Sequence, residues 1–412
     1  MEGDNYIEFL RYCLDETLPL PESAGKLDWM HLMQWAEQQA VVGVIYGGIQ
    51  RAGKALNIPF GDLMEWIGYA QQIEAQNRLV NRRCVELAAE LKAEGFDCCI
   101  LKGQGNALLY PNPLLRTPGD IDIWCLPLSP PFPDKASLPV AFPKSEGSNV
   151  RKIIKYVRSK NPGAKACYHH VDYGDFEGVE VEVHYRPAFL NDLVKNRRLQ
   201  KWFLSRAGRT DVAELPNGAG QMKVPSWEFN VVFMMCHLYT HLLKEGVGMK
   251  QVVDYYYLLK STERRVQNTG SSVLGAERSA QNTESCAQDA GGSARRPEGE
   301  GRLVSVLERL GLTEIAGAVM WVLKEVLGLE ERFLIAPVDE RRGRFLLGEI
   351  LQGGNFGLYE GGDSPGAAGR RSAVARNLLR LQRDARLVRY FPSECLWEPV
   401  FRLWHFFWRA AM

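Results

Sequence analysis

The sequence has little of what marks several large classes of protein. Lysine and arginine together number 50 and the acidic residues 49, so there is no basic excess and no strong signal for nucleic-acid binding. The nine cysteines are scattered without a CxxC pair, which argues against a disulfide framework or a cysteine zinc site and suits a reducing compartment. No run approaches about 18 uninterrupted apolar residues, so we expect no transmembrane segment, and the acidic N-terminus is unlike a secretory signal. These absences predict a cytoplasmic protein.

The apolar pattern divides the 412 residues into three regions. Residues 1–95 carry apolar residues at helical spacing and predict an N-terminal helical region. Residues 96–225 contain short apolar and alternating runs, which predict a small α/β core with a proline-rich excursion at 126–148. Residues 226–412 again predict helices, interrupted by a polar, glycine- and serine-rich segment at 262–302 that we expect to be disordered. The predicted class is therefore α+β: a small mixed-sheet core flanked by N-terminal and C-terminal helical regions.

Acidic residues occur in two segments of the core that read as strands. In "DIDIW", Asp120 and Asp122 are one residue apart, so on a strand both project from the same face, about 6–7 Å apart along the chain. The run "GVEVEVHYRP" alternates strictly, which places Glu180 and Glu182 on one face and valines on the other. If the two strands are neighbours, a glutamate joins the aspartates. Converging carboxylates repel one another unless a cation neutralises them, and hard oxygen ligands suit Mg²⁺ or Mn²⁺.

A glycine turn precedes the two aspartates. The stretch "LKGQGNALLYPNPLLRTPGDIDIW" (101–124) places two glycines directly after a short apolar run. A strand, a glycine turn and a helix N-terminus expose backbone N–H groups that hold phosphates, although this turn is neither a Walker A loop nor GxGxxG. Nearby, Lys102 and Arg116 supply positive charge for the same phosphates. The predicted nucleotide-binding residues are Lys102, Gly103, Gln104, Gly105 and Arg116.

The order of these segments resembles a known family. The stretches "ILKGQGNALLY", "RTPGDIDIW", "VEVEVHYRP" and "HLYTHLLKEGVGMKQVVDYYYLL" are similar to the uncharacterised bacterial nucleotidyltransferase family within the DNA polymerase β-like superfamily. The similarity covers about residues 30–260 and a later "GGNFG" at 353–357. It implies that the glycine turn binds nucleotide phosphates, and that an Asp-x-Asp pair and a third acid on a later strand bind two Mg²⁺ ions.

The resemblance also implies which acids form the metal site. The pair corresponds to Asp120 and Asp122. The third acid corresponds to Glu182, because the family pattern acid–apolar–His–aromatic–Arg matches "EVHYR" here, while Glu180 remains a near competitor. In the turn, Gln104 stands where the superfamily usually has glycine or serine.

The predicted function is a Mg²⁺- or Mn²⁺-dependent nucleotidyltransferase that moves an NMP from an NTP to an unidentified acceptor by a two-metal mechanism. Asp120, Asp122 and Glu182 are the predicted catalytic and metal-binding residues. A non-catalytic nucleotide-binding or interaction scaffold on the same fold is the alternative. A glycosyltransferase with a DxD motif is less favoured, because it needs a larger nucleotide-binding domain where the preceding residues read as helical.

Histidines and one further acid are candidates for lining the site. His237 and His241 stand four residues apart on an apolar helix, but without an HExxH glutamate or a third ligand a zinc site is disfavoured. The resemblance includes these two histidines and Asp254, and His184 lies within its acid-containing motif, so we expect all four to border the site.

Two other features remain open from the sequence. His169 and His170 are adjacent, so on a strand at most one of them faces the carboxylates. The aromatic C-terminal stretch "EPVFRLWHFFWRAAM" either docks against the protein's own helices, which is the favoured interpretation, or lies on a membrane surface.

Overall fold

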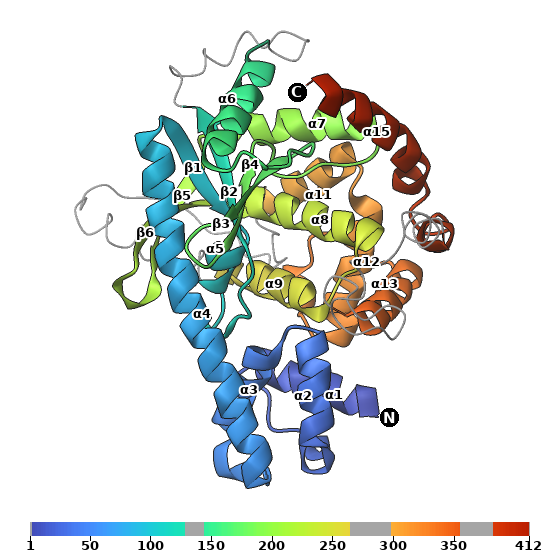
Figure 1. Ribbon diagram of the computed structural model, residues 1–412. Helices are drawn as coiled ribbons and strands as arrows, with labels where there is room; N and C mark the ends of the chain where they lie inside the picture. The colour runs from blue at the N-terminus through green and yellow to red at the C-terminus, as the bar shows by residue number, and fades with distance from the viewer. Residues whose placement is uncertain (1, 128–143, 264–297, 355–381, 412) are drawn as a thin grey trace, which may run out of the picture.

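The computed structural model describes residues 2–127, 144–263, 298–354 and 382–411, and Figure 1 colours them along the chain. Within these residues helices precede and follow a small sheet, as predicted. In chain order the elements are α1 (Glu2–Leu14), η1 (Glu22–Lys26), α2 (Trp29–Gln38), α3 (Val42–Ala52), η2 (Gly53–Ala55), α4 (Phe60–Ala93), β1 (Phe96–Leu101), α5 (Gly103–Ala107), η3 (Pro113–Leu115), β2 (Ile121–Pro127), α6 (Lys144–Lys160), β3 (His170–Asp175), β4 (Glu180–His184), α7 (Leu193–Leu204), β5 (Thr210–Leu215), η4 (Pro216–Gly218), β6 (Gly220–Pro225), α8 (Trp227–Lys244), α9 (Met249–Lys260), α11 (Glu298–Leu310), α12 (Thr313–Trp321), η5 (Val322–Val326), η6 (Glu331–Phe333), α13 (Glu340–Gly353) and α15 (Pro392–Ala411).

The central sheet is mixed and has the strand order β1-β2-β4-β3. Strand β2 pairs antiparallel with β1 and parallel with β4, and β3 completes the sheet antiparallel to β4. The parallel register places Asp122 opposite Glu182. The two acidic strands predicted from the sequence are therefore neighbours, and the predicted α+β class is confirmed.

The two faces of this sheet have different partners because side chains alternate along each strand. On one face, Ile121, Ile123 and Val183 are buried in a core with residues of α4 and α6. On the other face, Trp124 stacks on Phe229 of α8, with ring centroids 5.3 Å apart. The acids of β2 and β4 lie on this second face, toward α8.

Helix α4 connects the N-terminal helices to the sheet. It spans 34 residues and runs the length of the left side of Figure 1. Its first half buries Trp66 and Ile73 with the N-terminal helices, and its second half buries Cys84 and Leu87 against the sheet. The same helix thus belongs to both hydrophobic cores, which positions the N-terminal helices relative to the acidic strands.

Several boundaries differ from those expected. Helix α7 and the β5–β6 hairpin within residues 96–225 were not predicted, because their half-exposed residues lack a clear apolar period. In the proline-rich excursion, β2 continues to Pro127 and α6 begins at Lys144, while residues 128–143 lie outside the described structure.

The polar insertion expected at 262–302 lies mostly outside the described residues. Residues 264–297 belong to that part of the chain, and the last five residues of the expected segment form the start of α11, which begins at Glu298. Of the "GGNFG" stretch, only Gly353 and Gly354 are described.

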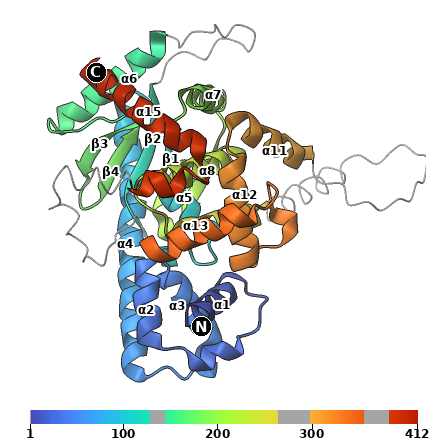
Figure 2. The same ribbon diagram turned by 90° about the vertical axis from the view of Figure 1, so that its right-hand side faces the viewer.

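Helix α15 docks against the protein through one of its faces. Phe401 and Trp408 contact the ring of Tyr168 at centroid distances of 5.5 and 6.0 Å, and the C-terminal end of the helix lies near α6 in Figures 1 and 2. On its other face, Leu403 and Phe407 are each 62% exposed. The favoured interpretation, internal docking, thus holds for one face of the helix.

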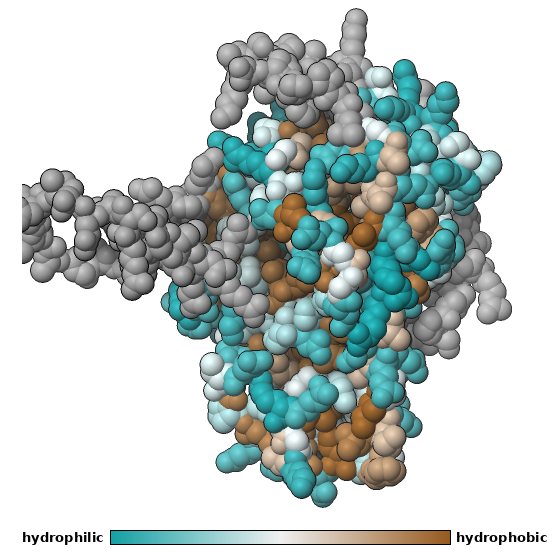
Figure 3. Space-filling model, turned by 90° about the vertical axis from the view of Figure 1, so that its left-hand side faces the viewer, coloured by the Kyte–Doolittle hydropathy of each residue, from teal (hydrophilic) through white to brown (hydrophobic). Residues whose placement is uncertain are grey.

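The surface on the side of α4 mixes hydrophilic and hydrophobic residues, and hydrophobic ones appear both in the middle and at the bottom of Figure 3. Across the described ranges, no helix combines the length and apolar character needed to cross a membrane.

Candidate active site

Three carboxylates converge on the face of the sheet that looks toward α8. Asp120 directly precedes β2 and Asp122 lies within it. Glu182 lies on β4, opposite Asp122 in the parallel register. One oxygen of each of the three lies within 4.8 Å of the others. Glu180, by contrast, is exposed and pairs with Asp175 toward the end of the sheet. The structure therefore brings Glu182, and not Glu180, to the two aspartates.

Lys102 joins this cluster from the turn after β1. Its Nζ lies 3.0 Å from Asp122 Oδ2 and 3.5 Å from His237 Nε2. Burial by itself would lower the pKa of Lys102, but the surrounding acids outweigh that effect and raise the pKa above its ordinary value. The residue also has a φ of 36° and a ψ of −136°, a backbone conformation that costs about 1–3 kcal/mol for a side chain other than glycine.

The strained turn places Lys102 and Gly103 beside the carboxylates. Gly103 has a φ of 45°, and a Cβ at that position would lie 3.8 Å from the backbone oxygen of Asp120. Strain held at this position is typical of functional sites, where the surrounding structure over-determines an unfavourable conformation.

A cavity of about 220 Å³ opens beside the carboxylates. Five of the seven histidines in the chain line it. Its walls are formed by Lys102, Asp120, Asp122, His169, His170, Glu182, His184, Pro187, Ala188, Phe189, His237, Thr240, His241, Lys244 and Glu245.

His170 and His184 contact Glu182 from two sides. His170 Nδ1 lies 3.0 Å and His184 Nε2 lies 3.3 Å from Glu182 Oε2. His184 Nε2 also lies 2.9 Å from Asp122 Oδ1, so it bridges two of the acids. Burial would lower the pKa of both histidines, but their polar neighbours raise the pKa of His170 to about 12 and that of His184 above its ordinary value.

The pKa values of Asp120 and Glu182 are shifted in opposite directions. Repulsion from Asp122, together with burial, raises the pKa of Asp120. Burial would also raise the pKa of Glu182, but His170 and His184 outweigh it and hold that pKa well below its usual range. A cation bound at the cluster would therefore offset the repulsion between Asp120 and Asp122 and lower the pKa of Asp120.

The expectation that only one of His169 and His170 faces the site was wrong. Both line the cavity, and their rings are 4.3 Å apart between centroids. Strand β3 begins at His170, so the alternation of side chains does not apply to His169, whose backbone oxygen instead accepts hydrogen bonds from Tyr185 and Arg186. Burial lowers the pKa of His169 well below its ordinary value.

Three of the four residues predicted to border the site do so: His184, described above, and His237 and His241. His237 and His241, one helical turn apart on α8, form the wall opposite the sheet, with ring centroids 4.2 Å apart. Burial, with Lys102 nearby, lowers the pKa of His237 well below its ordinary value. His241 Nδ1 lies 2.9 Å from Glu245 Oε2. The pair contributes to a cavity wall.

Arg116 and Asp254 were expected at the site, but they bind each other beneath it. Arg116 donates from Nε and Nη2 to the two oxygens of Asp254, each at 2.7 Å, and both residues are buried. Tyr110 donates a further hydrogen bond of 2.6 Å to Asp254. This bidentate pairing occupies the guanidinium, and neither partner lines the cavity.

Gln104 and Gly105 are likewise directed elsewhere. The buried Gln104 side chain donates to Asn77 Oδ1 at 3.3 Å and to Asn81, both on α4. A Cβ on Gly105 would lie 3.2 Å from Val224 Cγ1 on β6, so this glycine permits the hairpin to approach α5. Gly105 instead borders a second cavity, of about 250 Å³, which shares only Lys102 with the first.

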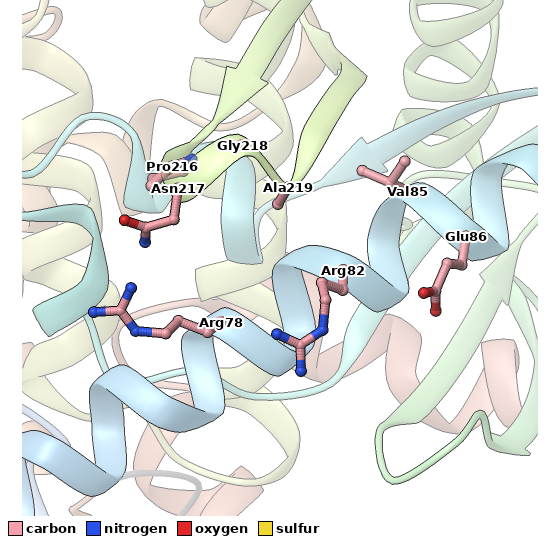
Figure 4. A pocket seen from close by; sticks show the side chains of 8 residues that line it. All are labelled: Arg78, Arg82, Val85, Glu86, Pro216, Asn217, Gly218 and Ala219. Atoms are coloured by element: carbon pink, nitrogen blue, oxygen red, sulfur yellow. The ribbon is translucent and has the colours of Figure 1, made fainter.

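Another hollow, of about 280 Å³, lies between α4 and the β5–β6 hairpin and is shown in Figure 4. Arg78 and Arg82 of α4 project along one side of it, below Asn217 and Gly218 at the hairpin tip. It contains Glu86 as its one acid and none of the predicted site residues. Of these three hollows in the described residues, the histidine-lined cavity is the one that contains Asp120, Asp122 and Glu182.

A mixed sheet with an acidic cluster beside a glycine turn is the arrangement expected of nucleotidyltransferases from the sequence. The sequence matches a family model described as uncharacterised nucleotidyltransferase over residues 25–129 and 144–279. This match spans more than half of the chain, and the chain belongs to that family.

Other comparisons add little. A search of curated proteins finds no match. Among solved structures, the chain is similar to an antigenic nucleotidyltransferase-like protein from Paracoccidioides brasiliensis, with 16% identity over 45% of this chain and 75% of that one and a TM-score of 0.27. A likeness at this score is too distant to bear on the fold or the function of this chain.

Proposed function

We propose that this protein transfers a nucleoside monophosphate from an NTP to an acceptor, with Asp120, Asp122 and Glu182 as ligands of Mg²⁺ or Mn²⁺. The observation that supports the proposal is the convergence of these three acids on one cavity wall, in a chain that belongs to a nucleotidyltransferase family. Like charges held this close are costly unless a cation neutralises them.

The donor set fits such an ion. The three oxygens within 4.8 Å of one another are hard donors, which Mg²⁺ and Mn²⁺ prefer. When bound, the ions would neutralise the triphosphate oxygens and lower the pKa of an attacking hydroxyl.

The neighbouring residues have separate roles in this proposal. Lys102 supplies a positive charge at the mouth of the glycine turn for the triphosphate, and His237 limits where its ammonium can lie. His184 holds the side chains of Asp122 and Glu182 in place through its Nε2. The low pKa of Glu182 keeps it ionised, as a metal ligand must be. Most of the rate would then come from positioning and charge neutralisation.

The proposal differs from the sequence prediction at the phosphate site. Lys102 and Gly103 are retained, because they lie beside Asp120 and Asp122. The side chains of Gln104 and Arg116 are not, because the amide nitrogen of Gln104 donates to α4 and the guanidinium of Arg116 pairs with Asp254.

Two substitutions on the same strand test the proposal. The full-length protein is incubated with each α-labelled NTP, Mg²⁺ and a cell extract, and labelled adducts are detected by mass spectrometry. Glu182→Gln should lower adduct formation by about a hundredfold or more, while Glu180→Gln, two residues away on the exposed end of β4, should leave it unchanged. Equal activity of the two variants would refute the assignment of Glu182.

Nucleotide binding separates this function from a non-catalytic scaffold. Calorimetry with ATP and Mg²⁺ should show metal-dependent binding that Asp122→Asn weakens. Metal-dependent binding without adduct formation from any NTP would favour the nucleotide-binding scaffold, and no binding at all would favour an interaction scaffold.

A further inference from the structure

Two histidines beside the carboxylates have oxygen atoms within 3.3 Å of both ring nitrogens, and the buried His170 Nδ1 makes no hydrogen bond despite this proximity. His170 Nδ1 lies 3.0 Å from Glu182 Oε2, and its Nε2 lies 3.2 Å from Asp172 Oδ1. His184 Nε2 lies 2.9 Å from Asp122 Oδ1 and 3.3 Å from the same oxygen of Glu182, and its Nδ1 lies 3.3 Å from the backbone oxygen of Arg186. Ionised carboxylates and carbonyls only accept hydrogen bonds, and a neutral imidazole has one N–H. In each ring, one nitrogen lone pair therefore faces an oxygen lone pair unless a proton or a metal ion lies between them.

The outer contacts of the two rings indicate which nitrogens would bind an ion. A carboxylate or a backbone carbonyl at the far nitrogen commonly orients a metal-binding histidine, and Asp172 and the Arg186 carbonyl occupy these positions. Protons on the far nitrogens direct the lone pairs of His170 Nδ1 and His184 Nε2 toward Glu182, and an ion bound there would replace the contact of His184 Nε2 with Asp122 Oδ1. Ligand atoms of these two histidines and of Glu182 all lie within 4.8 Å of one another.

We propose that His170, Glu182 and His184 form a binding site for a divalent transition-metal ion of the Zn²⁺ type, beside the Asp120–Asp122 pair. Imidazole nitrogen suits Zn²⁺ and its neighbours in the first transition series, whereas Mg²⁺ prefers oxygen alone. The inference rests on the proposed function for the adjacent carboxylate site, with which it shares Glu182. The two sites differ in the metal that they select.

The surroundings of the site give such an ion a role. Two histidines and a glutamate are a ligand number found in catalytic zinc sites, which leave a further position for water or substrate. All three side chains line the cavity that also contains Asp120 and Asp122. The remaining position of the ion is therefore accessible to an acceptor oxygen or phosphate, and the site would orient the acceptor toward the nucleotide.

Zinc binding in the presence of saturating Mg²⁺ tests this site. Calorimetry should show one equivalent of Zn²⁺ bound, and X-ray absorption of the zinc-loaded protein should show two imidazole ligands and no sulfur. His170→Phe should remove one imidazole and weaken binding by at least a hundredfold. Asp172→Asn, which alters only the outer contact, should weaken binding by about 10–100-fold. The matched control is His241→Phe, a histidine in the same cavity outside the cluster, which should leave both readings unchanged.

Each contrary result overturns the inference. Absence of stoichiometric zinc binding to the wild-type protein would show that the two rings are held as imidazolium ions. A sulfur ligand would place the ion instead at Cys167, which forms a neighbouring group with His169 and His170. Equal loss in His170→Phe and His241→Phe would remove the assignment to these residues. Failure of the proposed function is seen separately, as Mg²⁺-dependent adduct formation that survives Asp120→Asn.

Discussion

Two clusters of buried charge lie close together in this protein, and they differ in how their charges are matched. In the first, Arg116 and Asp254 form a bidentate pair that Tyr110 completes, away from either cavity that contains Lys102. Each donor has its acceptor within the protein. Such a cluster has no capacity left for a ligand, and it ties the segment before β2 to α9.

In the second cluster, the carboxylates meet on a cavity wall. Asp120, Asp122 and Glu182 repel one another, and Lys102 is held against them by a strained backbone. The protein maintains this arrangement at a cost in stability, which is typical of functional sites. Burial and ion pairing are common to both clusters, whereas the open cavity and the surplus of acids distinguish the second one.

The largest effect is expected on NTP turnover when an aspartate of the carboxylate cluster is changed to asparagine. The same type of substitution at the Arg116–Asp254 pair serves as the contrast. Asp122→Asn should lower NTP turnover by about a thousandfold or more, because it removes a carboxylate that holds the metal ions. Its free energy of unfolding should fall by less than that of Asp254→Asn, because removing one of three mutually repelling acids relieves repulsion on Asp120 while Asp120 and Glu182 still attract Lys102. Turnover with α-labelled NTPs and urea unfolding measure the two effects. A large loss of stability with normal turnover would reverse the assignment of the clusters.

At the matched pair, the expected effect is on stability. Asp254→Asn should lower the free energy of unfolding by about 3–5 kcal/mol, because it leaves the buried Arg116 guanidinium without its counter-ion. Replacing both partners by apolar residues, as in Arg116→Met with Asp254→Leu, should recover most of this loss. Urea unfolding of the single and double variants provides the measurement. If the double variant were no more stable than Asp254→Asn, the interpretation of Arg116 and Asp254 as a self-contained ion pair would be contradicted.

Glu394 is a third buried acid, and its ion pair with Lys195 is longer than that of Asp254 with Arg116. Burial raises the pKa of Glu394 from its ordinary value of 4.5 to about 7, although its Oε2 accepts a hydrogen bond of 2.6 Å from the Asn191 amide and its Oε1 lies 4.0 Å from Lys195 Nζ. The folded protein therefore binds this proton more tightly than the unfolded chain. The resulting stabilisation is complete below pH 4.5 and is lost as the pH rises through about 7.

The size of this pH effect follows from the shift. Between pH 5 and pH 8, the wild type should lose about 2–3 kcal/mol of unfolding free energy relative to Glu394→Gln, which keeps the acceptor oxygen but does not titrate. Urea unfolding at several pH values measures the difference. Parallel pH profiles of the two proteins would show that Glu394 is already ionised in the folded state.

The smallest expected effect concerns Tyr110. Tyr110→Phe should lower the free energy of unfolding by about 1.5 kcal/mol, because it removes one hydrogen bond to the ionised Asp254 and leaves the pair with Arg116 intact. NTP turnover should stay within about twofold of the wild type. A turnover loss as large as that of Asp122→Asn would show that the matched cluster also takes part in the chemistry.

The predictions from sequence succeeded where the information is local. Alternation along "DIDIW" and "VEVEVH" predicted that Asp120, Asp122 and Glu182 share strand faces; in the structure Asp122 and Glu182 are paired on neighbouring strands, and Asp120, directly before β2, lies with them. The pattern could not show that Arg116 and Gln104 are engaged elsewhere, because their partners lie on other helices. Nor could it show that His169 and His170 share a cavity, since that depends on the residue at which β3 begins.

By itself, the sequence determined the α+β class, the acidic strand faces and the glycine turn, because each depends on residues close together in the chain. Only the tertiary structure decided which acid completes the cluster, which basic residue faces it and which histidines surround it. These choices depend on the register of β2 against β4 and on the packing of α8 over the sheet, where segments about 60 residues or more apart meet. Pairing across such distances is set by the burial of whole faces, which no local pattern encodes.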